Sequence, residues 1–103
     1  MVNIFSSSIR IEIYLHRTGY VELYSDGRPL YTGSRESCMA HIRKTMAELD
    51  RLGNKDVTFA IKNYTSDPMQ AGMDRAYFKR HLLALASGSS CTIHVNTGLD
   101  TQA

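Results

Sequence analysis

Apolar and polar positions alternate along several short segments of this sequence, beginning with the segment from Ile9 to His16. Its apolar positions are Ile9, Ile11, Ile13 and Leu15, and the positions between them are Arg10, Glu12, Tyr14 and His16. A period of two residues predicts a β-strand that buries one side only. The alternation returns at Val21 and Leu23, which predicts a second strand of the same kind.

A tight turn and an edge strand are predicted next. Asp26-Gly27 favours a hairpin, because both residue types accept the positive φ that such turns need. Pro29 has no N–H to donate to a neighbouring strand, so the segment from Pro29 to Thr32 is predicted to be a short strand at the edge of the sheet. The first three strands should therefore form an antiparallel meander.

Helical spacing replaces the alternation at Ser34. Ser34 is a suitable N-cap, and Gly53-Asn54 is typical of a helix end. The predicted apolar stripe is Cys38, Ile42, Met46, Leu49 and Leu52, with Met39 beside it. The predicted solvent side is Arg35, Arg43, Lys44, Glu48 and Arg51.

Two further strands and a second helix complete the pattern. The predicted strands bury Val57, Phe59 and Ile61, and then Cys91, Ile93 and Val95. Asp67 and Pro68 suit the start of a helix, but Gly72 weakens the first turns, so the helix is expected over residues 73–86. Its predicted apolar side is Phe78, Leu82 and Leu85, flanked by Ala76 and Leu83.

The order β-β-β-α-β-α-β predicts an α+β fold, a two-layer sandwich of a five-stranded mixed sheet with two helices on one face. Residues 1–96 should form a single domain, and residues 97–103 a flexible tail. This order of elements resembles the ribonuclease H-like architecture. The first-strand aspartate that binds metal in that family has no counterpart, because its position falls among Ile13, Tyr14 and Leu15.

One polar side on nearly every strand indicates that the outer face of the sheet is open. A sheet covered on both faces would have continuously apolar strands. The residues expected on the open face are Arg10, Glu12, Tyr14, His16, Tyr20, Glu22, Tyr24, Thr58, Ala60, Lys62, Thr92 and His94.

Composition narrows the class of protein. A chain of 103 residues with a net charge of +2 suits one globular domain, and this charge alone does not indicate a nucleic-acid partner. Cys38 and Cys91 fall on apolar stripes and are expected to be reduced core thiols. We find neither a secretory signal nor an apolar segment of membrane-spanning length, so we expect a cytoplasmic protein without a membrane partner.

The stretch Gly19-Tyr20-Val21 followed by Tyr31-Thr32-Gly33 resembles the paired tripeptides of GIY-YIG endonucleases. That resemblance implies a metal-dependent nuclease with an arginine on the following helix and a later glutamate that binds the metal. Arg43 could supply the arginine, although His41 lies nearer the usual spacing. No glutamate follows Glu48 in the sequence, so the metal would lack its protein ligand. We therefore expect a structural hairpin here, and a nuclease is the third hypothesis.

Other catalytic chemistry lacks a motif. The sequence contains no G-x-S-x-G, phosphate loop, dinucleotide fingerprint or H-E-x-x-H. The two cysteines are expected on the buried side of the sheet and His16 and His94 on the other, so thiol and base would be separated. We expect no catalytic residues, no metal and no cofactor.

Nucleic-acid binding is the second hypothesis. Arg75, Lys79 and Arg80 place positive charge on the second helix, where Asp74 is the one opposing group. Such a helix face could follow a phosphate backbone, and the sheet tyrosines could stack on the bases of RNA or single-stranded DNA.

Protein binding is the first hypothesis. Tyrosine is enriched at interface hot spots, and a mixed polar face suits a non-obligate interface. The candidate protein-binding residues are Tyr14, Tyr20, Tyr24, Lys62 and His94. We expect a small non-catalytic regulatory protein that docks on a larger protein or ribonucleoprotein complex, with pairing of two copies as an alternative. By analogy in size and in lack of motifs, it resembles phage or plasmid accessory proteins that inhibit host nucleic-acid-targeting complexes, such as anti-CRISPR proteins.

Overall fold

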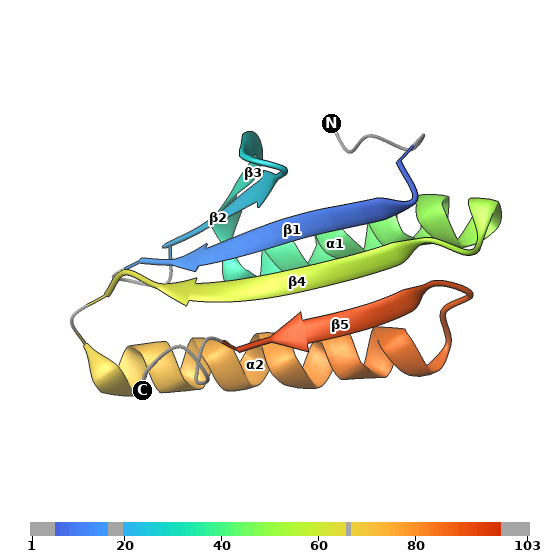
Figure 1. The fold of residues 1–103 in the computed structure, drawn as a ribbon. Coiled ribbons are helices and arrows are strands. Elements are labelled where there is room, and N and C mark those ends of the chain that lie inside the picture. Colours follow the sequence, from blue (N-terminus) through green and yellow to red (C-terminus); the bar gives the residue numbers. More distant parts are fainter. Residues whose placement is uncertain (1–5, 17–19, 66, 98–103) are drawn as a thin grey trace.

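The structure is a computed structural model that describes residues 6–16, 20–65 and 67–97 (Figure 1). Its elements are β1 (Ser8–Leu15), β2 (Tyr20–Ser25), β3 (Arg28–Ser34), α1 (Arg35–Leu52), β4 (Asp56–Asn63), α2 (Pro68–Ser87) and β5 (Thr92–Asn96). The α+β class and the order of elements are as predicted. Most of the predicted tail, positions 98–103, lies outside the described residues, as does the connection at 17–19.

The five strands form one mixed sheet in the order β3-β2-β1-β4-β5. Strand β2 is antiparallel to β1 and β3, whereas β4 is parallel to both β1 and β5. Strand β1 is central, and its Tyr14 is paired with Glu22 on β2 and with Lys62 on β4. This register brings the polar side chains of three strands together on one face of the sheet.

The two edges of the sheet differ. Strand β3 forms one edge and contains Pro29, and the pairing of β2 with β3 is shifted between Leu23 and Tyr24. Strand β5 forms the other edge and is five residues long. The edge strand predicted from Pro29 is confirmed, although it extends from Arg28 to Ser34.

Helix α1 begins and ends where its capping residues predict. The Ser34 hydroxyl accepts a hydrogen bond from the backbone N–H of Ser37, and the N–H of Gly53 returns to the Leu49 carbonyl. The assignment of Leu52 to the apolar stripe of this helix was wrong, because Leu52 is 51 % exposed. It follows Leu49 by three residues, which turns it about 60° around the helix axis and away from the sheet.

Helix α2 begins at Pro68, earlier than the predicted start at Met73. The Asp67 carboxylate accepts hydrogen bonds from the N–H groups of Met69 and Gln70, so the cap holds the first turn in spite of Gly72. The assignment of Ala76 and Leu83 to the apolar side of this helix was wrong. Ala76 and Leu83 are exposed because they lie on the far side of the helix from Phe78.

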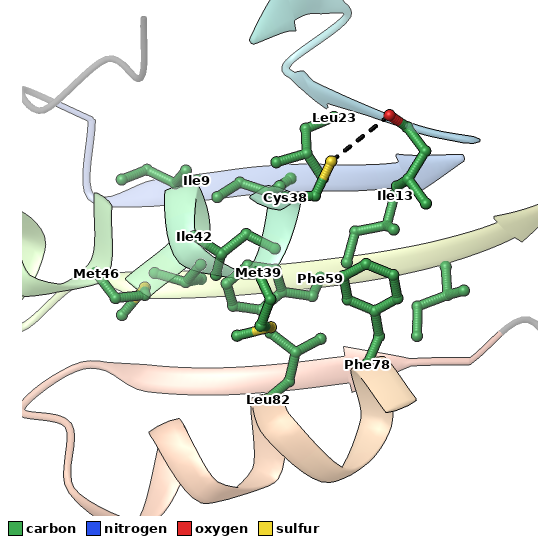
Figure 2. Packing of buried hydrophobic residues seen from close by; sticks show 14 of the residues in the cluster. Ile9, Ile13, Leu23, Cys38, Met39, Ile42, Met46, Phe59, Phe78 and Leu82 are labelled. Carbon is green, nitrogen blue, oxygen red and sulfur yellow. Dashed lines mark hydrogen bonds between the residues drawn. The ribbon is translucent and has the colours of Figure 1, made fainter. Parts of the chain in front are cut away.

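The core lies between the inner face of the sheet and the two helices (Figure 2). Figure 2 shows Phe59 from the sheet beside Met39 of α1 and Phe78 and Leu82 of α2. Cys38 belongs to this core and donates a hydrogen bond from its Sγ to the Val21 carbonyl at 3.5 Å. Burial raises the pKa of the Cys38 thiol to about 11. Both cysteines are buried and free, as predicted.

Candidate functional site

The outer face of the sheet carries the polar side chains of each strand, while the core and both helices lie on the other side. Tyr14 and Tyr24 are half-buried on this face, and Lys62 and His94 are exposed. Ala60 departs from the prediction that it would be accessible, because it is only 2 % exposed. Its methyl group is short and lies in register with Glu12 on β1 and Asn96 on β5.

Five ring side chains form a connected group on this face, which we call the aromatic cluster: Tyr14, His16, Tyr20, Tyr24 and Tyr64. Tyr14 is central. Its ring centroid lies 5.1 Å from that of Tyr24 at an interplanar angle of 88°, and 5.3 Å from that of Tyr64 at 21°. Edge-to-face and offset stacking are the favoured arrangements of aromatic pairs, so the rings hold one another in place.

Charged groups beside the cluster fix Tyr14 further. Its hydroxyl donates to Glu12 Oε1 at 2.8 Å, and Glu12 Oε2 lies 3.3 Å from Lys62 Nζ and 3.4 Å from Arg10 Nε. Burial is the largest influence on Glu12 and raises its pKa, but the hydrogen bonds from Tyr14 and Lys62 outweigh it, so the pKa is lowered. The hydrogen bond to Glu12 in turn raises the pKa of Tyr14 to about 12.

A second polar pair lies at the other side of Tyr14. His16 Nε2 is 2.7 Å from Glu22 Oε1, and both side chains are about three-tenths exposed. Glu22 is paired with Tyr14 across the strands. The cluster therefore has a carboxylate on each side, Glu12 bound by cations and Glu22 bound by histidine.

A shallow concavity opens between the cluster and the turn from β2 to β3. Its volume is about 300 Å³, and it is lined by Tyr14, Glu22, Tyr24, Gly27 and Tyr64. Gly27 has a φ of 83°, in the region that the Asp26-Gly27 turn was predicted to use. The turn and three tyrosine rings together shape a site large enough for one side chain of another molecule.

The predicted protein-binding residues divide into two groups. Tyr14, Tyr24 and Lys62 lie together, and Tyr20 joins them through His16, whose ring centroid is 5.3 Å away. His94 is separate, on β5. Its Nε2 is 2.8 Å from Asp56 Oδ1, and more than half of each of these two side chains is exposed.

Sequence reasoning missed Tyr64, which it assigned to no strand or helix. The backbone N–H of Tyr64 donates to the Leu15 carbonyl at 2.8 Å, so pairing with β1 continues one residue beyond the end of β4. Tyr64 follows Lys62 by two residues and reaches the same face of the sheet. Extending the alternation of β4 by one more step would have found it.

The predicted nucleic-acid-binding residues do not form one face of α2. Arg75 and Lys79 are four residues apart and share a side, whereas Arg80 is turned about 100° from Lys79. Arg75 is partly buried, and its Nε has no hydrogen-bond partner in the described structure. Asp74, which the sequence indicated as the group opposing this positive charge, has a side chain that is 0 % exposed and pairs with Arg35 of α1.

Basic side chains of the two helices contact each other instead. Arg43 Nη2 of α1 lies 3.1 Å from His81 Nδ1 of α2. Burial lowers the pKa of His81, and the positive charges of Arg43 and Arg80 lower it further. A neutral His81 can accept the hydrogen bond from Arg43, which connects the two helices.

The two tyrosines of the GIY-YIG-like pattern lie on opposite sides of the sheet. Tyr20 contacts His16 on the outer face, whereas Tyr31 stacks on His41 of α1 at a centroid distance of 4.8 Å. Burial lowers the pKa of His41. Over the ranges that the structure describes, no three histidine, cysteine or carboxylate side chains are grouped to hold a metal ion.

Within the same ranges, neither helix is long and apolar enough to cross a membrane. A comparison of the chain with protein-family models, with curated proteins and with solved structures found no match. The function must therefore be argued from the aromatic cluster, the concavity and the helix charges themselves.

Proposed function

We propose that this protein is a non-catalytic binding domain that docks on a larger protein, or on the protein part of a ribonucleoprotein complex, through the outer face of its sheet. The observation that carries this proposal is the aromatic cluster beside an open concavity. Tyr20 and Tyr64 are 43 % and 63 % exposed, which leaves large ring surfaces for a partner to cover.

The cluster has two properties that favour protein recognition. Tyrosine combines a large contact area with a polar hydroxyl, which is why it is enriched at interface hot spots. The stacked rings and the bond from Tyr14 to Glu12 also restrict the side chains before any partner arrives. Ordering these side chains on binding then costs little conformational entropy.

A narrower form of the proposal concerns the partner. A small domain without a catalytic motif suits an accessory protein, of phage or plasmid type, that docks on a host nucleic-acid-targeting complex and inhibits it. This narrower form is an analogy with anti-CRISPR proteins in size and in the absence of motifs. Its test is inhibition of such a complex by the purified protein.

The experiment for the docking surface compares variants that lack tyrosines on opposite sides of the sheet. The tagged protein is used to capture partners from a host lysate, and a captured partner is then purified and its binding measured by calorimetry. Tyr24→Ala combined with Tyr64→Ala should lose the partner. Tyr31→Ala is the matched control, because Tyr31 is exposed but lies on the helix side. A double variant that keeps full affinity would remove the outer face from consideration.

Nucleic-acid binding is a second candidate, and the contact between Arg43 and His81 favours it. That contact places Arg43 of α1 beside His81 of α2, and the positive charges of Arg43 and Arg80 both act on His81. Affinity for a labelled single-stranded oligonucleotide should then fall by at least tenfold between about 50 and 200 mM salt, because bound counterions are released.

Two double variants locate such binding. Arg43→Ala with Arg80→Ala removes the two positive charges next to His81. Arg75→Ala with Lys79→Ala removes the two positive charges that share one side of α2. Weaker binding in the first variant alone would assign the interface to the seam between the helices. An affinity that does not change with salt, or no binding at low salt, would remove this candidate.

A further inference from the structure

The concavity on the outer face combines aromatic rings with a carboxylate. Its lining residues in the described structure are three tyrosines, one glycine and Glu22, so the charged group among them is a carboxylate. The Tyr14 and Tyr24 rings meet at 88°, which gives the concavity two walls that are nearly perpendicular. The faces of aromatic rings attract cations, and a nearby carboxylate adds to that attraction.

The same combination already holds an arginine elsewhere in this molecule. The Cζ atom of Arg35 lies 4.9 Å from the centroid of the Tyr77 ring, and its Nη1 lies 3.1 Å from Asp74 Oδ1. A guanidinium group is therefore bound by a tyrosine face and a carboxylate together. The concavity offers these two components at the surface, where a group from another molecule can reach them.

The charged groups next to the concavity leave room for such a cation. Lys62 Nζ is bound to Glu12 at 3.3 Å and lies 6.0 Å from the centroid of Tyr14, so Glu12 already neutralises the cation next to the concavity. His16 occupies Oε1 of Glu22. A carboxylate has about four lone-pair positions, so Glu22 can accept a further donor while it keeps His16.

We propose that the concavity binds the guanidinium group of an arginine side chain presented by a partner protein. The proposal rests on the proposed function and names the chemistry of the contact. A guanidinium group is planar, stacks on aromatic faces and is less strongly hydrated than an ammonium group, so it fits these walls better than lysine does. A volume of about 300 Å³ suits one such side chain.

The test uses small probes and the full chain. N-acetyl-arginine methylamide is titrated into the isotope-labelled protein, and amide and tyrosine ring shifts are followed by NMR. We expect saturable shifts at Glu22, Tyr24, Gly27 and Tyr64, with a dissociation constant on the order of 10 mM for a single side chain. The citrulline analogue, which has nearly the same shape but no charge, should bind at least threefold more weakly, and the lysine analogue should also bind more weakly.

Four variants test which residues of the concavity bind the probe. Glu22→Gln should weaken the arginine probe about three- to fivefold, and Glu48→Gln, which removes the same charge from the exposed side of α1, should not. Tyr24→Leu should weaken binding by a similar factor, whereas Tyr24→Phe, which keeps the ring face, should retain it. Each variant is first shown by its NMR spectrum to be folded.

Several results would overturn the proposal. These are equal binding of the arginine and citrulline probes, an arginine affinity that Glu22→Gln leaves unchanged, and shifts that spread over the surface without saturating. Failure here is distinguishable from failure of the docking surface. Suppose that the Tyr24→Ala/Tyr64→Ala variant loses the partner although the wild-type protein does not bind the arginine probe. That result would keep the outer face as the interface and rule out the guanidinium site.

Discussion

Arg35 on α1 and Asp74 on α2 form an ion pair that joins the two helices beneath the sheet. Arg35 Nη1 lies 3.1 Å from Asp74 Oδ1, and the Asp74 side chain is 0 % exposed, whereas that of Arg35 is 29 % exposed. Asp74 Oδ2 accepts a second hydrogen bond from Gln70 at 3.0 Å. Arg35 also contacts Glu36 at the surface. The acid of this pair is therefore inaccessible to water, and the base is not.

That asymmetry predicts unequal effects of removing the two partners. Arg35→Met leaves a buried carboxylate with Gln70 alone and should lower the free energy of unfolding by about 2 to 3 kcal/mol. Asp74→Asn should cost less, about 1 kcal/mol, because the free Arg35 can still reach water and Glu36. Urea denaturation followed by circular dichroism measures both changes.

Glu36→Gln is the control for this pair. It removes the exposed partner of Arg35 and should change stability much less than Arg35→Met does, because water already screens this pair. If Arg35→Met is no more destabilising than Glu36→Gln, the buried pair does not join the helices as described.

Two glycines should respond to alanine in opposite directions. A Cβ atom at Gly33 would lie 2.5 Å from Ser37 Oγ and 3.3 Å from the Tyr31 ring, whereas one at Gly72 would meet nothing within 4 Å. Gly33→Ala should destabilise by about 1 to 2 kcal/mol through this steric conflict. Gly72→Ala should stabilise by about 0.5 to 1 kcal/mol, because alanine favours the helix and restricts the unfolded chain.

The conflict at Gly33 can be tested by a double-mutant cycle. Ser37→Ala removes the hydroxyl that the new methyl group would strike, although it also removes a hydrogen bond to the Ser34 carbonyl. The double variant should therefore be more stable than the sum of the two single changes indicates. Simple additivity would place the cost of Gly33→Ala elsewhere.

The phenol of Tyr14 should lose its proton at an unusually high pH. Its hydrogen bond to Glu12 is the largest cause of a pKa raised to about 12, from an ordinary value of 10.0. A pKa that is higher in the folded state stabilises the fold below about pH 10, and this contribution is lost as the pH rises through about 12. Phenolate absorbance should show the Tyr14 phenol titrating in this range.

Two variants assign the late titration. Tyr14→Phe should abolish it, and Glu12→Gln should move it toward lower pH because the charged acceptor is gone. A titration curve that is the same in wild type and Tyr14→Phe would show that this hydrogen bond does not protect the phenol.

Both thiols should be unreactive in the folded protein. Cys38 and Cys91 are buried, and burial raises the pKa of Cys38 to about 11, so little thiolate forms near neutral pH. A thiol-specific reagent at pH 8 should label neither cysteine on the time scale of mixing and both in urea. Rapid labelling of Cys38 in the native protein would contradict its place in the core.

Alternation could predict β1 and β2 because each of these strands buries one side only. Local chemistry was also sufficient for the ends of α1, since Ser34 and Gly53 act through bonds to residues within four positions. The same reasoning could not place Asp74. A carboxylate is normally solvated, and the partner that makes its burial tolerable, Arg35, is 39 positions away in the sequence.

The candidate site was predictable in part for the same reason. The placement of Tyr14, Glu22 and Lys62 on one face follows from strands with one polar side, although their register does not. The ring geometry does not, because the tilt of Tyr24 and the stacking of Tyr64 depend on side-chain packing across three segments. His94 was grouped with the tyrosines because it shares their face, although its pairing with Asp56 lies toward the other end of the strands.

The difference between the two edge strands of the sheet limits how copies of this chain can associate. Pro29 and the shifted register make β3 a poor template for an incoming strand, which leaves β5 as the margin for backbone pairing. If two molecules pair along β5 about a twofold axis, the β5 edge of each molecule is occupied. Assembly of that kind ends at two copies and cannot extend into a fibre.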